Sequence, residues 1–492
     1  MENQKNHFVN LGKAFHCSVG ILFLCTAMNP TKYLYTQIMS KSNNELLGFI
    51  QYALNYFCAA IGCLASSYIL DKFGVKWCLT ISAIIDTLWI LAIIPSALIS
   101  ENPSIRDSFI ASDFFIYTSQ TLIQIMQGLF LGIKWVAGNK YISQCATEET
   151  KGFYFSFFLG MYMLSIILGS LISAFISKSL HQSTYLFIMT ILASLSIVLF
   201  YTLVQPIPQE RFIPDDDDQT KDNEILIEQN SENSKILKNT QNYSAILEDP
   251  DLSNDYSQSN NSNFVQNTNL SETKIYLNQE VKEVLLLIKS RKMLPLIPLL
   301  LWVGISEAIY FEILLNIIID TQSIGDYQYK ISNSMLTMVT FGTGELIGSL
   351  FTGWMIDKYG NKKTVTINIV LVSIQTILKL IYLINYKFSW FAYFLTFVWG
   401  LQDGLINTLS IEMLGFEFKN NSQSYAVSNL GLCLSASLFS FIQGFVKGKE
   451  QYIIYTTIVG FIGILSNISA LFFKFKPMPD QLKQSMKQDL NK

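Results

Sequence analysis

The sequence predicts an all-α membrane protein with twelve transmembrane helices arranged as two six-helix halves. Three observations predict this fold class. Half of the 492 residues are hydrophobic and only 14% are charged, which is typical of a polytopic membrane protein rather than a soluble one. Apolar runs long enough to cross a bilayer recur along the chain. A short charged motif appears twice, each time at the end of such a run.

There are six apolar runs in each half of the chain, and each has the roughly 20 residues that a membrane-spanning helix needs. The first six lie at 11–30, 46–70, 77–99, 114–137, 153–176 and 184–204. The second six lie at 294–319, 331–356, 364–384, 390–414, 424–446 and 452–473. We therefore expect an N-terminal half over 1–205, a C-terminal half over 291–475 and a cytosolic tail over 476–492. The first run lacks a small-residue cleavage site, so we interpret it as span 1 and not as a removed signal.

Residues 206–290 separate the halves and differ from them in composition. They contain four consecutive acids, at 215–218, many Asn and Ser, and few aromatic residues. Such a segment cannot bury enough apolar surface to become ordered, so we expect a disordered cytosolic loop. The helical spacing and basic end of 280–292 favour either an amphipathic helix on the membrane surface or the beginning of span 7.

The distribution of basic residues predicts the orientation in a lipid bilayer. Most of the 34 Lys and Arg residues lie in the two termini, the central loop and the loops on the same side. Because basic loops stay in the cytosol, we expect both termini and the central loop to be cytosolic. The net charge of -3 gives no reason to expect a nucleic-acid partner.

The repeated motif ends span 2 and span 8. Its copies are Asp71-Lys72-Phe73-Gly74-Val75-Lys76 and Asp357-Lys358-Tyr359-Gly360-Asn361-Lys362. The match extends upstream without a gap, so that Gly62 corresponds to Gly348. An ungapped recurrence indicates an internal repeat whose unit is half of the protein. Gly74 and Gly360 allow the left-handed turn that ends one helix before the next begins.

A carboxylate at a helix C-terminus is unfavourable unless a cation or another helix N-terminus lies nearby. The motif is therefore either a polar hairpin with cytosolic lysines or a latch between two moving halves. Its repetition favours the latch, with gating residues Asp71, Lys72, Gly74, Lys76, Asp357, Lys358, Gly360 and Lys362. Neutralising either aspartate should then weaken the cytosolic closure by roughly 1–2 kcal/mol, the scale of a partly buried charge at a helix end.

This motif resembles the loop between spans 2 and 3 of major facilitator superfamily transporters, Gly-x-x-x-Asp-Arg/Lys-x-Gly-x-Arg/Lys, which recurs there between spans 8 and 9. The second copy, from Gly353 to Lys362, fits the pattern, whereas the first has Ser67 in place of the glycine. Val75 and Asn361 replace a basic residue that the family usually has. The resemblance implies two six-helix pseudo-repeats that work by alternating access.

Two further stretches resemble the Unc-ninety-three-like family, a divergent branch of the superfamily named for an ion-channel regulatory protein. Span 4 has Trp135 followed by Tyr141, and span 10 has Gly400 and Asp403 in a Gly-x-x-Asp pattern. This resemblance covers both six-helix halves and implies a regulatory or trafficking subunit of a membrane protein such as a potassium channel. The chain departs from proton-coupled members of the superfamily, which usually carry an arginine where this sequence has Gln124.

Ionisable side chains inside a membrane are costly, so each one is a candidate for function. Those within the predicted spans are Asp86, Lys134, Glu307, Glu312, Glu345, Lys379 and Asp403. Spans 1, 4, 7 and 10 line the central cavity in the superfamily, which implies a substrate or cation site made of Glu307, Glu312, Asp403 and Lys134. Lys134 either joins this site or extends to the cytosolic surface. For Asp86, Glu345 and Lys379 we expect structural pairing or a wet crevice.

Glu307 and Asp403 lie near the middle of their spans. For both residues the sequence supports a functional role and a structural role equally. On the cavity spans the only basic residue is the peripheral Lys134, so we expect a negative cavity. Two close carboxylates cannot both stay ionised in a low dielectric. Either a cation therefore lies between them or one of them holds a proton.

The sequence contains no catalytic constellation. The three histidines form no cluster, and the seven cysteines are scattered without a Cys-x-x-Cys, so we expect no enzyme activity, metal or cofactor. Two classes remain, a transporter of a small solute, ion or proton and a non-transporting regulatory subunit. The mid-depth polar residues favour transport, whereas Gln124 and the second resemblance favour regulation. The sequence supports transport slightly more and identifies no solute.

Overall fold

The structure of the protein is a computed structural model. The described residues are 9–41, 45–102, 104, 108–109, 112–146, 150–207, 281–418 and 421–475. Within these ranges the structure is helical and has no strand. The two six-helix halves belong to one compact unit, Met1–Gln209 with Gln279–Lys492. Nearly all of the predicted loop at 206–290, and the tail at 476–492, lie outside the described residues.

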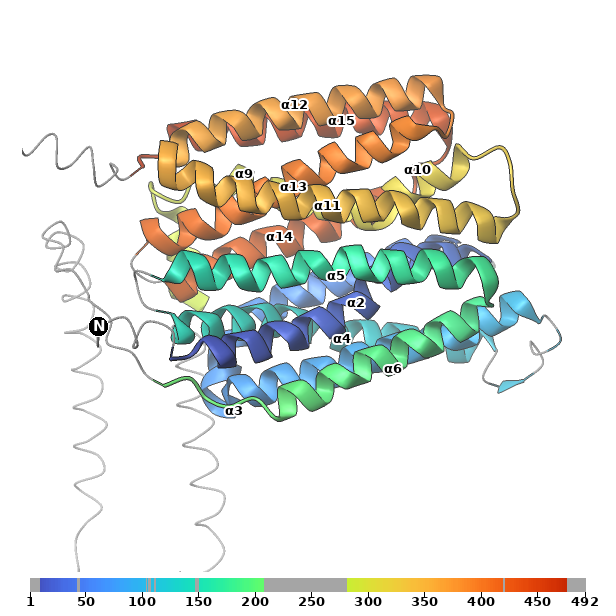
Figure 1. Cartoon of the computed structure of the whole chain (residues 1–492), viewed down its shortest axis with the longest axis horizontal. Coiled ribbons are helices and arrows are strands. Elements are labelled where there is room, and N and C mark those ends of the chain that lie inside the picture. Colours follow the sequence, from blue (N-terminus) through green and yellow to red (C-terminus); the bar gives the residue numbers. More distant parts are fainter. Residues whose placement is uncertain are drawn as a thin grey trace, which may run out of the picture. The chain divides into compact units, whose positions relative to one another are not determined.

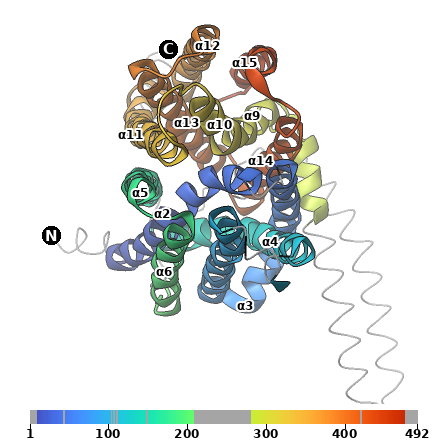
Figure 2. The same cartoon turned by 90° about the vertical axis from the view of Figure 1, so that its right-hand side faces the viewer.

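Figures 1 and 2 show the helices of the first half grouped beside those of the second. The first half consists of α2 (Leu11–Lys41), α3 (Glu45–Glu101), α4 (Asp113–Cys145), α5 (Lys151–Ser179) and α6 (Gln182–Tyr201). The second half begins with α9 (Ile297–Ala308), η5 (Ile309–Ile313) and α10 (Leu314–Asp320), which together form span 7. It continues with α11 (Tyr327–Tyr359), α12 (Asn361–Asn385), α13 (Trp390–Glu417), α14 (Asn421–Gln443), α15 (Gly448–Ser469) and η6 (Ala470–Phe472).

These helices account for the twelve predicted spans, because α3 contains spans 2 and 3. Ten of the spans are long and apolar enough to cross a membrane by length and composition. The other two are α11 and α13, with 33 and 28 residues. Both are long enough to cross a bilayer, and their buried surfaces carry Glu345 and Asp403.

The two motif glycines adopt the same backbone conformation. Gly74 has φ 76° and ψ 158° within α3, and Gly360 has φ 79° and ψ 164° between α11 and α12. Positive φ combined with extended ψ is a region that essentially only glycine occupies. The prediction of a glycine-dependent turn is therefore confirmed in both halves. The ψ values are extended and not those of a left-handed helical residue.

Glycines also bring equivalent helices into contact in the two halves. A Cβ atom on Gly62 would lie 2.0 Å from the backbone oxygen of Leu129, and one on Gly348 would lie 2.2 Å from that of Leu401. The first pair joins α3 to α4 and the second joins α11 to α13. Small residues allow this close approach of helix backbones. The internal repeat thus extends from the sequence to the packing of the helices.

The halves meet along α5 with α11 and along α3 with α14 (Figure 2). We call the end of the bundle that carries Gly74 and Gly360 the motif end. At the opposite end, Ser332 Oγ donates to the Ala174 carbonyl oxygen at 2.8 Å. Gln37 Nε2 donates there to Asn316 Oδ1 at 2.7 Å, from α2 to α10. These hydrogen bonds hold the halves together at the opposite end.

Two elements differ from their predicted extents. The helix expected over 11–30 continues to Lys41, because its last third is buried against protein and not exposed to lipid. Residues 281–289 form a helix that ends before turns at 290–296 lead into α9. Within the segment predicted at 280–292, residues 281–289 are therefore a separate helix and not the beginning of span 7.

Candidate functional site

A cavity lies between the two halves. Its volume open to the centres of water molecules is about 120 Å³, and one water needs about 10–15 Å³ by this measure. The cavity can therefore hold several waters or a small solute. Its polar lining residues include Tyr56, Asn139, Glu307, Glu345, Asn407, Ser428 and Asn429. The first two belong to the first half and the others to the second.

The cavity extends from mid-depth toward the motif end. Asn139, Ile411 and Tyr425 line it, and each lies near the end of its helix on that side. On the opposite side the rings of Tyr33 and Phe311 stack with centroids 5.2 Å apart, which joins α2 to η5. The helices are thus closed at the opposite end and hollow toward the motif end.

Glu307 projects from α9 into this cavity and is bonded to the other half. Tyr56 Oη of α3 donates to Glu307 Oε1 at 3.1 Å. Lys32 of α2 is buried, with its Nζ 4.8 Å from the centroid of the Phe311 ring. Its charge attracts the Glu307 carboxylate. Glu307 therefore has both a hydrogen-bond donor and a cation supplied by the first half.

Lys32 is the functional candidate that the sequence prediction missed. Span 1 was expected to end at residue 30, which placed this lysine in a loop outside the membrane. In the structure Lys32 lies inside α2, so the expectation that Lys134 is the only basic residue on the cavity spans is wrong. A signal was present, because Tyr33, Leu34, Tyr35, Ile38 and Met39 continue the apolar pattern and are all buried.

Asp403 of α13 is buried and held by two donors. Ser306 Oγ donates to Asp403 Oδ1 at 3.1 Å, and Asn407 Nδ2 donates to Asp403 Oδ2 at 2.8 Å. Ser306 directly precedes Glu307 in α9, and Asn407 lines the cavity. The two carboxyl groups are close enough to repel each other electrostatically. Glu307 and Asp403 therefore lie near each other through Ser306, and Glu307 lines the cavity whereas Asp403 does not.

Two more carboxyl groups lie near this pair. Glu345 of α11 is buried and lines the cavity, and its Oε2 has no hydrogen-bond partner among the described residues. Among the described residues this oxygen therefore has no structural partner. Glu312 lies in the single π-helical turn η5, a feature often found at functional sites, and accepts a hydrogen bond from Ser440 Oγ. Its other oxygen has no partner in the described part of the chain.

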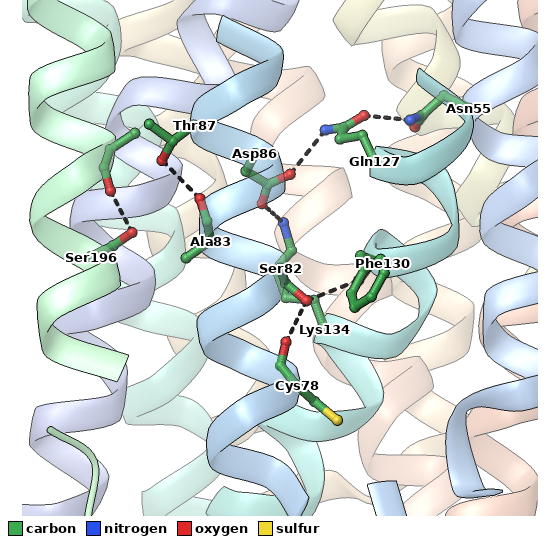
Figure 3. Close-up of polar contacts among 11 residues, drawn as sticks. Asn55, Cys78, Ser82, Ala83, Asp86, Thr87, Gln127, Phe130, Lys134 and Ser196 are labelled. Atoms are coloured by element: carbon green, nitrogen blue, oxygen red, sulfur yellow. Dashed lines mark hydrogen bonds and ion pairs between the residues drawn. The ribbon is translucent and has the colours of Figure 1, made fainter. Parts of the chain in front are cut away.

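Lys134 occupies a different place from the one predicted. Its Nζ lies 2.6 Å from Asp86 Oδ2, and both side chains are buried, with 5% and 3% of their surface exposed. Gln127 Nε2 donates to Asp86 Oδ1 at 3.1 Å, and Asn55 Nδ2 donates to Gln127 Oε1 (Figure 3). Lys134 is therefore the partner of Asp86 inside the first half and does not extend to the surface. The structural pairing expected of Asp86 is confirmed.

The predicted latch residues make their described contacts within their own halves. Asp71 Oδ1 lies 3.0 Å from Lys140 Nζ, and their side chains are 52% and 40% exposed. Lys76 Nζ lies 5.2 Å from the centroid of the Tyr201 ring. Lys358 Nζ lies 4.9 Å from that of Trp354. Asp71 is thus exposed in this arrangement of the halves and the latch stays a prediction, while the side chain of Asp357 lies outside the described structure.

The remaining latch lysine of the first copy, Lys72, is also near aromatic rings of its own half. Its Nζ lies 5.9 Å from the centroid of the Tyr68 ring and 5.8 Å from that of Phe73. Such contacts at exposed positions contribute about 0.5–1 kcal/mol. They orient the lysines around the motif without joining the halves.

Comparison with known proteins identifies what the chain is similar to. The family model for the Major Facilitator Superfamily matches residues 17–440. No curated protein matches the sequence. Among solved structures, a D-xylose-proton symporter is 14% identical with a TM-score of 0.62, covering 94% of this chain and 97% of the symporter. The partially occluded, inward-open xylose transporter XylE from E. coli is 14% identical with a TM-score of 0.59, covering 94% and 99%. At this level of identity, the structural likeness shows the fold.

Proposed function

The chain belongs to the major facilitator superfamily, and on that premise we propose that it is a secondary transporter of a small solute, coupled to a proton or another monovalent cation. The observation that carries this proposal is the cavity between the halves, which both halves line and which contains Glu307 and Glu345. Alternating access by two repeats that rock around a mid-membrane site needs such a shared cavity.

The balance of buried charge supports the coupling. Glu307, Glu345 and Asp403 interact electrostatically with one another, and the Lys32 ammonium interacts electrostatically with Glu307. Three ionised carboxylates beside one ammonium would leave excess negative charge in a low dielectric. A bound proton or cation removes this excess. We assign the coupling site to Glu307 and Asp403, with Lys32 as the internal cation that competes for Glu307.

The same proposal gives the latch a role in the other state of the cycle. The bundle is hollow toward the motif end, where Asp71 is exposed and paired within its own half. Closing that end would bring the motif against the second half, where a carboxylate near a helix N-terminus is favourable. We place the motif end in the cytosol because of the distribution of Lys and Arg.

Reconstitution in liposomes tests the proposal. A panel of small solutes is first screened for uptake. For a solute that is taken up, a pH-sensitive dye inside the vesicles should report proton entry, and uptake with and without a sodium gradient tests sodium as the coupling ion. Glu307→Gln and Asp403→Asn should abolish coupled accumulation while solute exchange across the membrane persists. Glu101→Gln is the matched control. The Glu101 carboxylate accepts a hydrogen bond from Ser183 Oγ at 2.6 Å and does not line the cavity, so its loss should leave coupling intact.

The contrary result has its own meaning. The resemblance of Trp135 and Asp403 to Unc-ninety-three-like patterns supports a regulatory or trafficking subunit of an ion channel, such as a potassium channel. A purified protein that moves no solute, proton or ion in liposomes, and that co-purifies with a channel from its native membrane, would refute transport. It would favour that regulatory role instead.

A further inference from the structure

We propose that the second half of the chain binds a single halide ion, of which chloride is the common example, at Lys379. A small cavity lies there between α9, α12, α13 and α15, separate from the cavity between the halves. Its lining includes Trp302, Gln375, Lys379, Trp399 and Thr456. Its volume open to the centres of water molecules is about 10 Å³, which corresponds to one water-sized occupant.

The polar groups around this cavity lack partners. Lys379 is 2% exposed, and within the described structure it has no ion pair. Its Nζ lies 4.9 Å from the centroid of the Trp399 ring. Trp302 Nε1, both amide atoms of Gln375 and Thr456 Oγ1 are buried without a hydrogen-bond partner among the described residues. Buried polar groups are normally hydrogen-bonded, so their convergence on one cavity indicates an occupant.

The chemistry of the lining favours an anion. The ammonium of Lys379, the indole N–H of Trp302 and the amide N–H groups of Gln375 are donors, and the hydroxyl of Thr456 can donate as well. A buried ammonium without a carboxylate either gives up its proton or gains a counter-charge, and a water molecule supplies no counter-charge. The volume holds one water-sized atom. A halide ion is somewhat larger than water and enters with a slight shift of the flexible Lys379 side chain, whereas a sulfate, phosphate or carboxylate, with several heavy atoms, does not fit.

This site is connected to Asp403 through Trp399 and Ser306. The ammonium of Lys379 lies over the ring of Trp399, and Trp399 Nε1 donates to Ser306 Oγ at 3.3 Å. Ser306 in turn donates to Asp403. Occupancy by an anion would screen the charge of Lys379 from this carboxyl group. The halide site itself does not depend on the proposed transport, because its residues are distinct from those that line the cavity between the halves.

Thermal unfolding of the purified full-length protein in detergent tests the proposal. At constant ionic strength, replacing gluconate by chloride or bromide should raise the apparent Tm saturably, whereas sulfate should not. Lys379→Met should abolish this halide response. Lys387→Met, the same substitution at an exposed lysine of the second half, is the control and should keep it. Thr456→Val, a smaller change, should retain the fold and shift the halide midpoint at least several-fold.

Bromide anomalous scattering gives a direct measurement on the unaltered protein. A bromide peak between Lys379 and Trp302 would support the site. The proposal is overturned if bromide is absent from this cavity, if the apparent Tm does not depend on halide, or if sulfate stabilises as strongly as chloride. A halide response that persists in Lys379→Met would overturn it as well.

Discussion

The buried ion pair between Asp86 and Lys134 permits a quantitative prediction about stability. Lys134→Met removes the cation and leaves the Asp86 carboxylate with Gln127 as its donor. Asp86→Asn keeps an acceptor for Gln127 but leaves the ammonium without a counter-charge. Because both side chains are almost completely buried and their atoms are 2.6 Å apart, each single change should cost about 3–5 kcal/mol.

The double variant Asp86→Asn with Lys134→Met removes both charges and should recover most of that loss. Neutral replacement of a buried pair is often harmless, since the cost of desolvating two ions disappears with them. Thermal unfolding in detergent should show apparent Tm decreases on the order of 10 °C for the single variants and a clearly smaller decrease for the double variant. The double-mutant cycle isolates the pair energy.

Two outcomes would contradict this reasoning. If each single variant lost less than about 1 kcal/mol, the pair would behave like an exposed one. If the double variant were no more stable than the worse single variant, the two charges would not depend on each other. Transport by the double variant, once a solute is known, also tests the location of Lys134. If Asp86 and Lys134 form a structural pair, the double variant should still transport the solute. If Lys134 belongs to the substrate site, the double variant should not transport it.

Three further predictions follow from the motif and the loop. Gly74→Ala and Gly360→Ala should each cost about 1–3 kcal/mol in thermal unfolding because of their backbone conformation, whereas Gly353→Ala, with open space around its Cβ position, should cost little. An epitope tag inserted within 214–255 should be labelled only from the cytosol, and labelling from the other side would reverse the orientation. Asp71→Asn should cost under about 1 kcal/mol because its ion pair is exposed, and it should increase cysteine accessibility at the motif end if the latch forms in the other state.

Much of the fold could be predicted because its determinants are local in the sequence. Apolar runs locate the spans, and the recurrence of Gly62 as Gly348 predicts that both halves share one packing arrangement. The end of α2 was mislocated for a physical reason. Its last turns are buried in protein, where neighbouring side chains can stabilise a polar residue such as Lys32. Hydropathy measures compatibility with lipid, so it does not detect a helix of this kind. Residues 31–41 therefore form part of the helix despite their polar beginning.

The site was less predictable, since its partners come from different helices. The sequence located Glu307 and Asp403 near one depth, but it did not predict that Ser306 connects them or that Tyr56 reaches across from the other half. Lys134 was assigned to the cavity because span 4 lines it in the superfamily. The position of Asp86 on the neighbouring span, which neutralises Lys134, becomes apparent only in three dimensions.

The partners of Glu307 provide a physical link between its charge and the arrangement of the halves. Glu307 belongs to the second half, whereas the hydroxyl of Tyr56 and the ammonium of Lys32 belong to the first. An ionised Glu307 attracts both groups and so favours the arrangement in which they are near it. A proton on Glu307 removes the attraction to Lys32, while the hydroxyl of Tyr56 can still bond. Under the proposed function, protonation of Glu307 therefore shifts the populations of the two arrangements of the halves. The size of the shift is set by the difference in the interaction energy of Glu307 between these two arrangements. The coupling then requires no contact between the transported solute and the motif end, only that solute and proton bind to the same arrangement of the halves.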